Sequence, residues 1–170
     1  GTMSVGKTTL VKALQELPEF KDYNFATERS KYLSDLGIPL NTDSTLKGQT
    51  VFLAERCAEL MNNNIITDRT IFDVIAFTMN AKSIGRYDKE IFESYAKEFI
   101  REYDYIFYIS PDGIPIEDNG VRETDEHYRD IIDFTITALI KKYGHMANKV
   151  EVIKGSTEER IEQILNVIEF

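Results

Sequence analysis

Residues 1–8 read Gly1-Thr2-Met3-Ser4-Val5-Gly6-Lys7-Thr8, and this stretch decides the fold. It matches G-x-x-x-x-G-K-[ST], the phosphate-binding loop (P-loop) of proteins that bind nucleoside triphosphates. Its two glycines allow backbone angles that a Cβ atom would forbid, so the amide groups of the loop can converge on phosphate oxygens. A helix predicted from Thr8 to about Leu17 directs the positive end of its dipole at the same anion. The pattern therefore predicts a nucleotide-phosphate site.

The side chains of the loop have distinct expected roles. Lys7 is expected to reach the β- and γ-phosphates of ATP, and the Thr8 hydroxyl to bind Mg²⁺. The predicted nucleotide-binding set comprises Gly1, Thr2, Met3, Ser4, Val5, Gly6, Lys7, Thr8 and, as a further phosphate contact, Thr9. The alternative is a chance turn before an amphipathic helix. It is disfavoured because four constraints fall within eight residues and a regular helical pattern follows.

A P-loop ordinarily follows a buried β-strand, and the sequence begins at Gly1. A parallel sheet lacking that strand would leave backbone groups unpaired, which is costly when they are buried. We therefore expect residues upstream of Gly1 to supply the first strand.

Composition favours one globular domain over residues 1–170. The net charge of −9 disfavours tight binding to nucleic acid, although one local basic cleft would suffice for it. Cys57 is the only cysteine, which excludes an internal disulfide and favours a reducing cytoplasm. It lies on the apolar face of a predicted helix and is expected to be a core residue. No apolar run is long enough to cross a membrane.

Strand and helix patterns alternate along the chain, which predicts an α/β fold: a parallel sheet flanked by helices. Strands are predicted at 23–27, 65–67, 105–109 and 150–153. After the first helix, helices are predicted at 28–36, from Asp43 or Ser44 to about 61, and at 71–79, 89–103, 124–143 and 158–170. The long connection at about 111–124 is a predicted lid. Counting the upstream strand, it lies between the fourth strand and the penultimate helix.

Candidate catalytic side chains follow the predicted strands, because ligands of open parallel sheets bind beyond the carboxyl ends of strands. Glu28 follows the strand at 23–27, and Asp68 and Arg69 follow the strand at 65–67. Asp68 is expected to hold Mg²⁺ or to act as the base, and Glu28 to hold or deprotonate the acceptor. Arg69 is expected to bind the acceptor. The structural alternatives are a helix cap for Asp68 and a solvated carboxylate for Glu28.

Two arginines stand in or beside the predicted lid. Arg122 lies within it, and Arg129 lies one turn into the next helix. A guanidinium group can bind phosphate oxygens in bidentate fashion and neutralise developing charge. Both are therefore predicted catalytic residues. The alternative is that they are surface arginines paired with Glu123, Asp125 or Asp133.

Taken together, these segments resemble a known family. They are the P-loop, Thr27-Glu28-Arg29-Ser30-Lys31-Tyr32-Leu33, Ile66-Thr67-Asp68-Arg69, Asp118-Asn119-Gly120-Val121-Arg122 and Tyr128-Arg129. The chain is similar to the P-loop kinases that include the nicotinamide riboside kinase domain of bifunctional NAD-biosynthesis proteins and related phage kinases and ATPases. The resemblance implies a nucleoside-kinase-like fold, Mg-ATP as the donor and a lid arginine at Arg122.

The predicted function is a Mg-ATP-dependent kinase that phosphorylates a hydroxyl group of a nucleoside, nucleotide or similar small molecule. One alternative is a phage-type kinase of 5-hydroxymethyluracil, with DNA as the acceptor. Another is a nucleotide-binding regulatory ATPase. The predicted catalytic residues are Lys7, Glu28, Asp68, Arg122 and Arg129. Thr8 and Asp68 are the predicted Mg²⁺ ligands, and Glu28 and Arg69 the predicted acceptor contacts. The sequence makes no prediction of oligomeric state.

Overall fold

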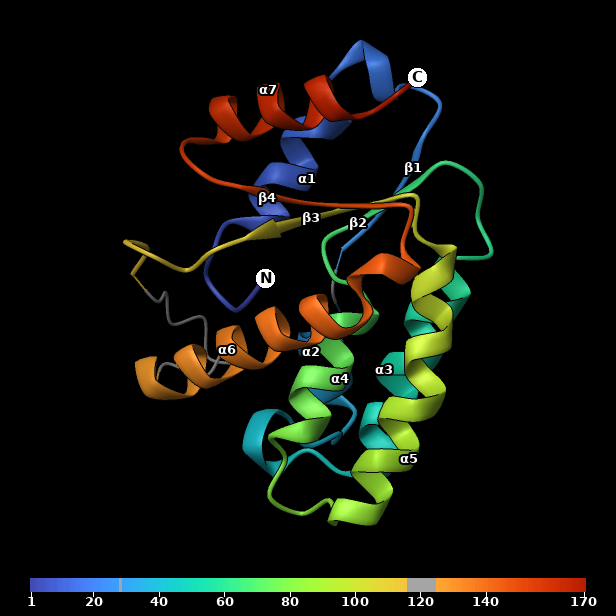
Figure 1. The fold of residues 1–170 in the computed structure, drawn as a ribbon, viewed down its shortest axis with the longest axis vertical. Coiled ribbons are helices and arrows are strands. Elements are labelled where there is room, and N and C mark those ends of the chain that lie inside the picture. The colour runs from blue at the N-terminus through green and yellow to red at the C-terminus, as the bar shows by residue number, and fades with distance from the viewer. Residues whose placement is uncertain (28, 116–124) are drawn as a thin grey trace.

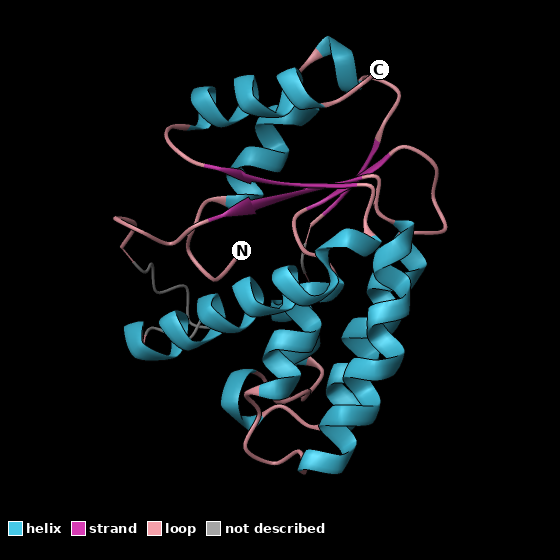
Figure 2. Ribbon diagram, viewed as in Figure 1, coloured by secondary structure: helices cyan, strands magenta, loops and turns pink. Residues whose placement is uncertain are grey.

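The computed structural model describes residues 1–27, 29–115 and 125–170. Its strands lie between two layers of helices (Figures 1 and 2). The predicted residues Glu28 and Arg122 lie outside the described ranges, as does the lid from residue 116 onward.

All the described strand pairs are parallel, as predicted. Strand β1 (Asn24–Ala26) pairs with β2 (Ile65–Thr67), with Asn24 opposite Ile65. Strand β3 (Tyr105–Ile109) pairs with β4 (Lys149–Ile153). Within the described ranges β2 has no second neighbour, and neither does β3. The sheet is therefore present as two pairs.

A cavity of about 720 Å³ is lined by both β2 and β3. Gly1, the first residue of the P-loop, also lines it. The strand expected upstream of Gly1 remains a prediction.

One layer consists of helices α1 (Lys7–Gln15) and α7 (Thr157–Val167), which lie on the same side of β3 and β4 (Figure 1). Their apolar side chains form one core cluster with residues of the P-loop and the strands. The buried members are Val5, Leu10, Leu14, Phe20, Ile109, Ile153 and Ile164. The P-loop is thus packed against both helices of this layer.

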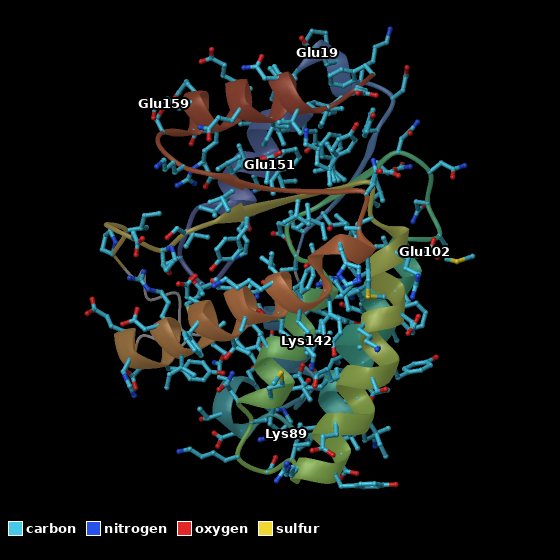
Figure 3. The ribbon with its side chains drawn as sticks, in the orientation of Figure 1. Glu19, Lys89, Glu102, Lys142, Glu151 and Glu159 are labelled. Carbon is cyan, nitrogen blue, oxygen red and sulfur yellow. The ribbon has the colours of Figure 1, made fainter. Side chains whose placement is uncertain are left out.

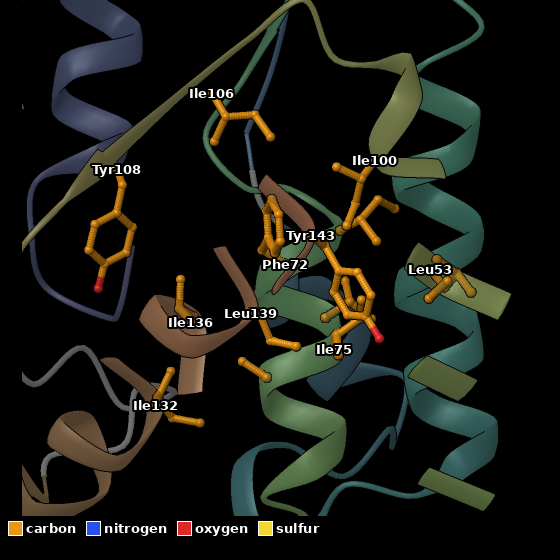
Figure 4. Packing of buried hydrophobic residues seen from close by; sticks show 14 of the residues in the cluster. Leu53, Phe72, Ile75, Ile100, Ile106, Tyr108, Ile132, Ile136, Leu139 and Tyr143 are labelled. Atoms are coloured by element: carbon orange, nitrogen blue, oxygen red, sulfur yellow. The ribbon is translucent and has the colours of Figure 1, made fainter. Parts of the chain in front are cut away.

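The opposite layer contains α3 (Leu46–Glu59), α4 (Ile71–Met79), α5 (Arg86–Ala96) and α6 (Glu126–Tyr143), with the short α2 (Ser30–Asp35) among them. Helix α4 is buried on most sides and forms the centre of the larger core cluster (Figure 4). The predicted bounds of α4 are confirmed. Among the described residues, none of the helices has the length and apolarity that crossing a membrane requires.

The boundaries of α3 and α5 differ from the predicted ones. The cap of α3 is Thr45, whose hydroxyl accepts a hydrogen bond from the amide of Gly48 at 3.0 Å, and not Asp43 or Ser44. The helix predicted at 89–103 instead begins at Arg86 and changes after Ala96 to 3₁₀ geometry at Lys97–Glu102.

Helix α3 ends at Glu59, before the predicted end at about residue 61, and Met61 is 86% exposed. Arg56 on this helix is fully buried and donates from Nη2 to Glu59 Oε1 at 2.6 Å. Cys57 packs against the larger cluster, where burial raises the pKa of its thiol. A raised pKa disfavours the reactive thiolate, in keeping with a core residue.

The position of Ile75 predicts a large loss of stability on truncation. This side chain is fully buried in the larger cluster (Figure 4). We expect Ile75→Ala to lower the free energy of unfolding by about 2–5 kcal/mol, because apolar burial is lost and a cavity is left behind. Urea denaturation measures the change, with Ile91→Ala as the matched control because Ile91 is 51% exposed on α5. Equal losses in both variants would contradict the assignment of α4 to the centre of the core.

Candidate functional site

The P-loop has the backbone geometry that its two glycines predict. Gly6 has a φ of 83°, in the left-handed region, and stands at the N-cap of α1. Gly1 is needed for a different reason, because a Cβ atom there would lie 2.7 Å from the carbonyl oxygen of Ile109. Ser4 also has a left-handed φ, at 59°. The loop therefore turns tightly against the end of β3 before α1 begins.

The loop presents a polar side and buries an apolar one. Met3 and Val5 are buried, whereas Gly6 is exposed and Lys7 is half-buried. Gly6 has no side chain with which to cap the first turn of α1. The amide groups at such a helix start are the usual donors to a bound phosphate. Lys7 lies close to these groups, since its Nζ donates a hydrogen bond to the carbonyl of Thr2.

The structure brings Thr8 and Asp68 together although 60 residues separate them in the chain. Thr8 Oγ1 donates a hydrogen bond to Asp68 Oδ2 at 2.8 Å. Asp68 follows β2 directly and is buried, with 7% of its surface exposed. Its alternative role as the cap of α4 is wrong, because Thr70 caps that helix in a capping box with Asp73.

The Thr8–Asp68 pair fits a magnesium ion. Mg²⁺ prefers hard oxygen ligands and is commonly held by one or two carboxylates together with substrate phosphates. A hydroxyl and a carboxylate oxygen already lie in contact beside the start of α1. The described residues contain no cluster of three or more His, Cys, Asp or Glu side chains suited to a metal.

Arg69 lies beside this pair and is held by neighbours on α4. Its Nη1 is 3.9 Å from Asp73 Oδ1, and its guanidinium carbon is 5.3 Å from the centre of the Phe77 ring. The buried Nε of Arg69 has no hydrogen-bond partner among the described residues. Arg69 is held beside Asp68 by its contacts with Asp73 and Phe77.

Asp73 is a residue of this site that the sequence reasoning missed. The amide N–H of Thr70 donates a hydrogen bond to Asp73 Oδ2 at 2.8 Å, and Asp73 Oδ1 lies 3.9 Å from Arg69 Nη1. The Asp73 carboxylate therefore links the start of α4 to the guanidinium group of Arg69. The spacing Thr70-x-x-Asp73 is a capping-box signal that could have identified it.

Arg129 is buried, with 8% of its surface exposed, so the alternative of a surface arginine is wrong. Its Nη1 donates a hydrogen bond to the carbonyl of Ile114 at 2.6 Å. Asp125, one of the suggested ion-pair partners, caps α6 instead. Arg129 thus anchors the connection that follows β3, whose next residues lie outside the described ranges.

Two further predicted residues are placed as follows. Thr9 is exposed on the first turn of α1. Thr2 is fully buried and its hydroxyl has no hydrogen-bond partner among the described residues. Thr2 therefore contributes to the loop through its backbone carbonyl, which accepts from Lys7.

Arg160 is a second residue that the sequence reasoning missed. It lies on α7 and donates from Nη1 to the carbonyl of Val5 in the P-loop at 2.7 Å. No local spacing could have identified it, because the two residues are 155 positions apart in the chain.

Comparison with known proteins agrees with this geometry. A family profile described as AAA domain matches residues 1–160. The deoxyadenosine kinase from M. mycoides with bound dCTP has a similar structure, with a TM-score of 0.66 and 18% sequence identity. The alignment covers 98% of this chain and 94% of that one. A second structure of that kinase, with dCMP and dCDP, has a TM-score of 0.62 and 18% identity over the same shares of the two chains. No curated protein matches the chain.

These similarities define the fold. An α/β arrangement of parallel strands flanked by helices is shared with the deoxyadenosine kinase. The narrower resemblance to nicotinamide riboside kinase domains and phage enzymes remains a prediction.

Proposed function

We propose that this chain, which belongs to the AAA domain family, is a kinase that uses Mg-ATP to phosphorylate a hydroxyl group. The acceptor is a nucleoside, nucleotide or similar small molecule. The observation that carries the proposal is the hydrogen bond of 2.8 Å between Thr8 and Asp68. It joins the P-loop to the carboxylate of Asp68, which follows β2. In such folds, ligands bind beyond the carboxyl ends of the strands.

The donor side of the proposed site consists of Lys7, the start of α1 and the Thr8–Asp68 pair. Lys7 and the first amide groups of α1 bind and orient the phosphates of ATP. Thr8 and Asp68 would hold Mg²⁺, which when bound neutralises charge on the transferring phosphoryl group. Phosphoryl transfer needs little besides such positioning and charge stabilisation.

The acceptor side consists of Arg69 and a carboxylate. The acceptor hydroxyl oxygen attacks the γ-phosphorus, the bond from that phosphorus to the β-phosphate bridge oxygen breaks, and ADP leaves. The hydroxyl proton passes to Asp68 or to Glu28, which lies outside the described residues. Arg69 directly follows Asp68, whose carboxylate contacts Thr8 of the P-loop, and this position supports its role in orienting the acceptor.

A nucleoside-type acceptor is supported by the fold. The structurally similar deoxyadenosine kinase contains deoxycytidine nucleotides in its two structures. The net charge of −9 also favours a small acceptor over DNA, because a polyanion is repelled except at a local basic site.

A panel of acceptors with labelled ATP tests the proposal. It includes deoxynucleosides, ribonucleosides, nicotinamide riboside, nucleoside monophosphates and DNA containing 5-hydroxymethyluracil. We expect label in a small product, with a rate that changes little with salt. Transfer to DNA alone, falling steeply with salt as counterion release requires, would replace the small acceptor by the DNA alternative. Slow ATP hydrolysis that no acceptor accelerates would favour a regulatory ATPase.

A further inference from the structure

We propose that Arg160 is a positioning residue of the nucleotide site, which holds the P-loop in its phosphate-binding conformation through the carbonyl group of Val5. This inference rests on the proposed function, since it assigns a role toward the phosphates of ATP. It extends the site to α7, which supplies no residue to the P-loop motif.

The contact is short and shielded from water. Arg160 Nη1 donates to Val5 O at 2.7 Å, and only 8% of the surface of Arg160 is exposed. A hydrogen bond from an ionised donor is stronger than a neutral one, and more so where water is excluded. The guanidinium group therefore fixes the direction of the Val5 carbonyl.

Fixing this carbonyl also fixes the next amide group. The peptide bond between Val5 and Gly6 is trans and planar, so its C=O and N–H groups point in opposite directions. Because the carbonyl of Val5 points to Arg160 on α7, the N–H of Gly6 points away from α7. Gly6 precedes the first turn of α1, where phosphate is expected. Arg160 thus orients a phosphate-binding donor without touching the phosphate.

The fit around Gly6 is equally close. A Cβ atom on Gly6 would lie 3.2 Å from Arg160 Nη1. The guanidinium group therefore packs directly against the turn whose φ is 83°. Gly6 is needed for its left-handed backbone, and a Cβ atom at this position would also crowd Arg160.

Helix α7 holds Arg160 rigidly in this position. Its first turn is fixed by a capping box between Ser156 and Glu159. Further along the helix, Ile164 packs in the same core cluster as Leu10 and Leu14 of α1. The neighbouring Glu159 is exposed at the molecular surface (Figure 3), whereas Arg160 is buried. The capped first turn and the packing of Ile164 therefore hold α7 with Arg160 facing the P-loop.

Stability alone gives a poor reason for an arginine here. Its buried Nε has no hydrogen-bond partner among the described residues. Burying an incompletely satisfied charged group is costly, and an apolar side chain of similar volume is often as stable or more so. The arginine is better explained by the one specific bond that it makes to the loop.

The test compares Arg160→Met, which keeps an unbranched side chain as far as the position of Nε but removes the guanidinium donors, with Arg160→Lys, which keeps a charged donor. Arg101→Met is the matched control, because the side chain of Arg101 is 63% exposed and pairs with Glu98. Hydrogen exchange of the nucleotide-free protein is measured at the amides of residues 4–8 and, separately, around Ile164 in α7. Binding of Mg-ATP and of inorganic tripolyphosphate is then measured for each variant.

We expect Arg160→Met to speed hydrogen exchange in the P-loop and to lower the affinity for both ligands by about tenfold or more. This is the loss typical of a hydrogen bond from a charged group. Exchange around Ile164 should stay unchanged, and Arg160→Lys should restore part of the loss. Unchanged exchange and affinity in Arg160→Met would overturn the inference. So would equal loss of protection in α7 and the P-loop, which would mean a structural role. If wild type bound neither ligand, the proposed function would fail, while the exchange data would still decide whether Arg160 holds the loop.

Discussion

Lys7→Ala is expected to lower kcat/KM for phosphoryl transfer by on the order of 10²-fold or more, because charge stabilisation at the transferring phosphate is lost. The fold should survive the change. Lys7 is only half-buried, and its ammonium group contacts the carbonyl of Thr2 within the same loop. Steady-state kinetics with the best acceptor of the panel measures the loss, and thermal unfolding checks the fold.

The matched control is Lys12→Ala. Lys12 is an exposed lysine in the last turn of the same helix, so this variant removes one positive charge at the end of α1 away from the phosphates. We expect its activity to stay close to that of wild type. Near-normal activity in a folded Lys7→Ala protein would remove the central claim of the proposal. An equal loss in Lys12→Ala would assign the effect to net charge instead.

Asp68→Asn is expected to reduce Mg²⁺-dependent turnover by on the order of 10²-fold, the scale on which loss of one electrostatic contact slows catalysis. Asparagine is nearly isosteric, so its side-chain oxygen still accepts the hydrogen bond that Thr8 Oγ1 donates at 2.8 Å in the wild-type site. The packing is thus preserved while the negative charge beside the cation is lost. Turnover is measured across a Mg²⁺ titration, with ATP affinity measured in parallel.

The control for this variant is Asp22→Asn. Asp22 is exposed and precedes β1, whereas Asp68 follows the end of β2, so the control removes a carboxylate at the other end of a strand. We expect ATP to bind Asp68→Asn nearly normally and the Mg²⁺ requirement to rise. Turnover equal to that of wild type at every Mg²⁺ concentration would reduce Asp68 to a structural residue.

The elements that were predicted accurately are those whose signals are local. Strand β2 and helix α4 have the predicted bounds, because a short β-branched run and a continuous apolar segment each specify their own conformation. The cap of α3 was placed one or two residues early, since Asp43, Ser44 and Thr45 are all good cap residues and the sequence does not show that Thr45 is the one that accepts from the amide of Gly48.

The candidate site was predictable where a motif or a topological rule applied. The P-loop was identified by its spacing. Asp68 was identified by the rule that ligand-binding residues follow parallel strands. The spacing of Thr70 and Asp73 is a capping-box pattern that could have identified Asp73, but the rule for strand ends does not cover it. The predictions for Glu28 and Arg122 remain untested, because both lie outside the described residues.

By itself, the sequence determined the phosphate-binding loop, the alternation of strands and helices, and the identity of the carboxylate that follows β2. These depend on residues close together in the chain, where spacing and backbone preference act directly. Only the tertiary structure decided that Asp68 contacts Thr8, that Arg129 is buried against Ile114, and that Arg160 reaches Val5. Such contacts depend on how separate segments pack across the sheet, and no local pattern records which buried arginine will meet which carbonyl group.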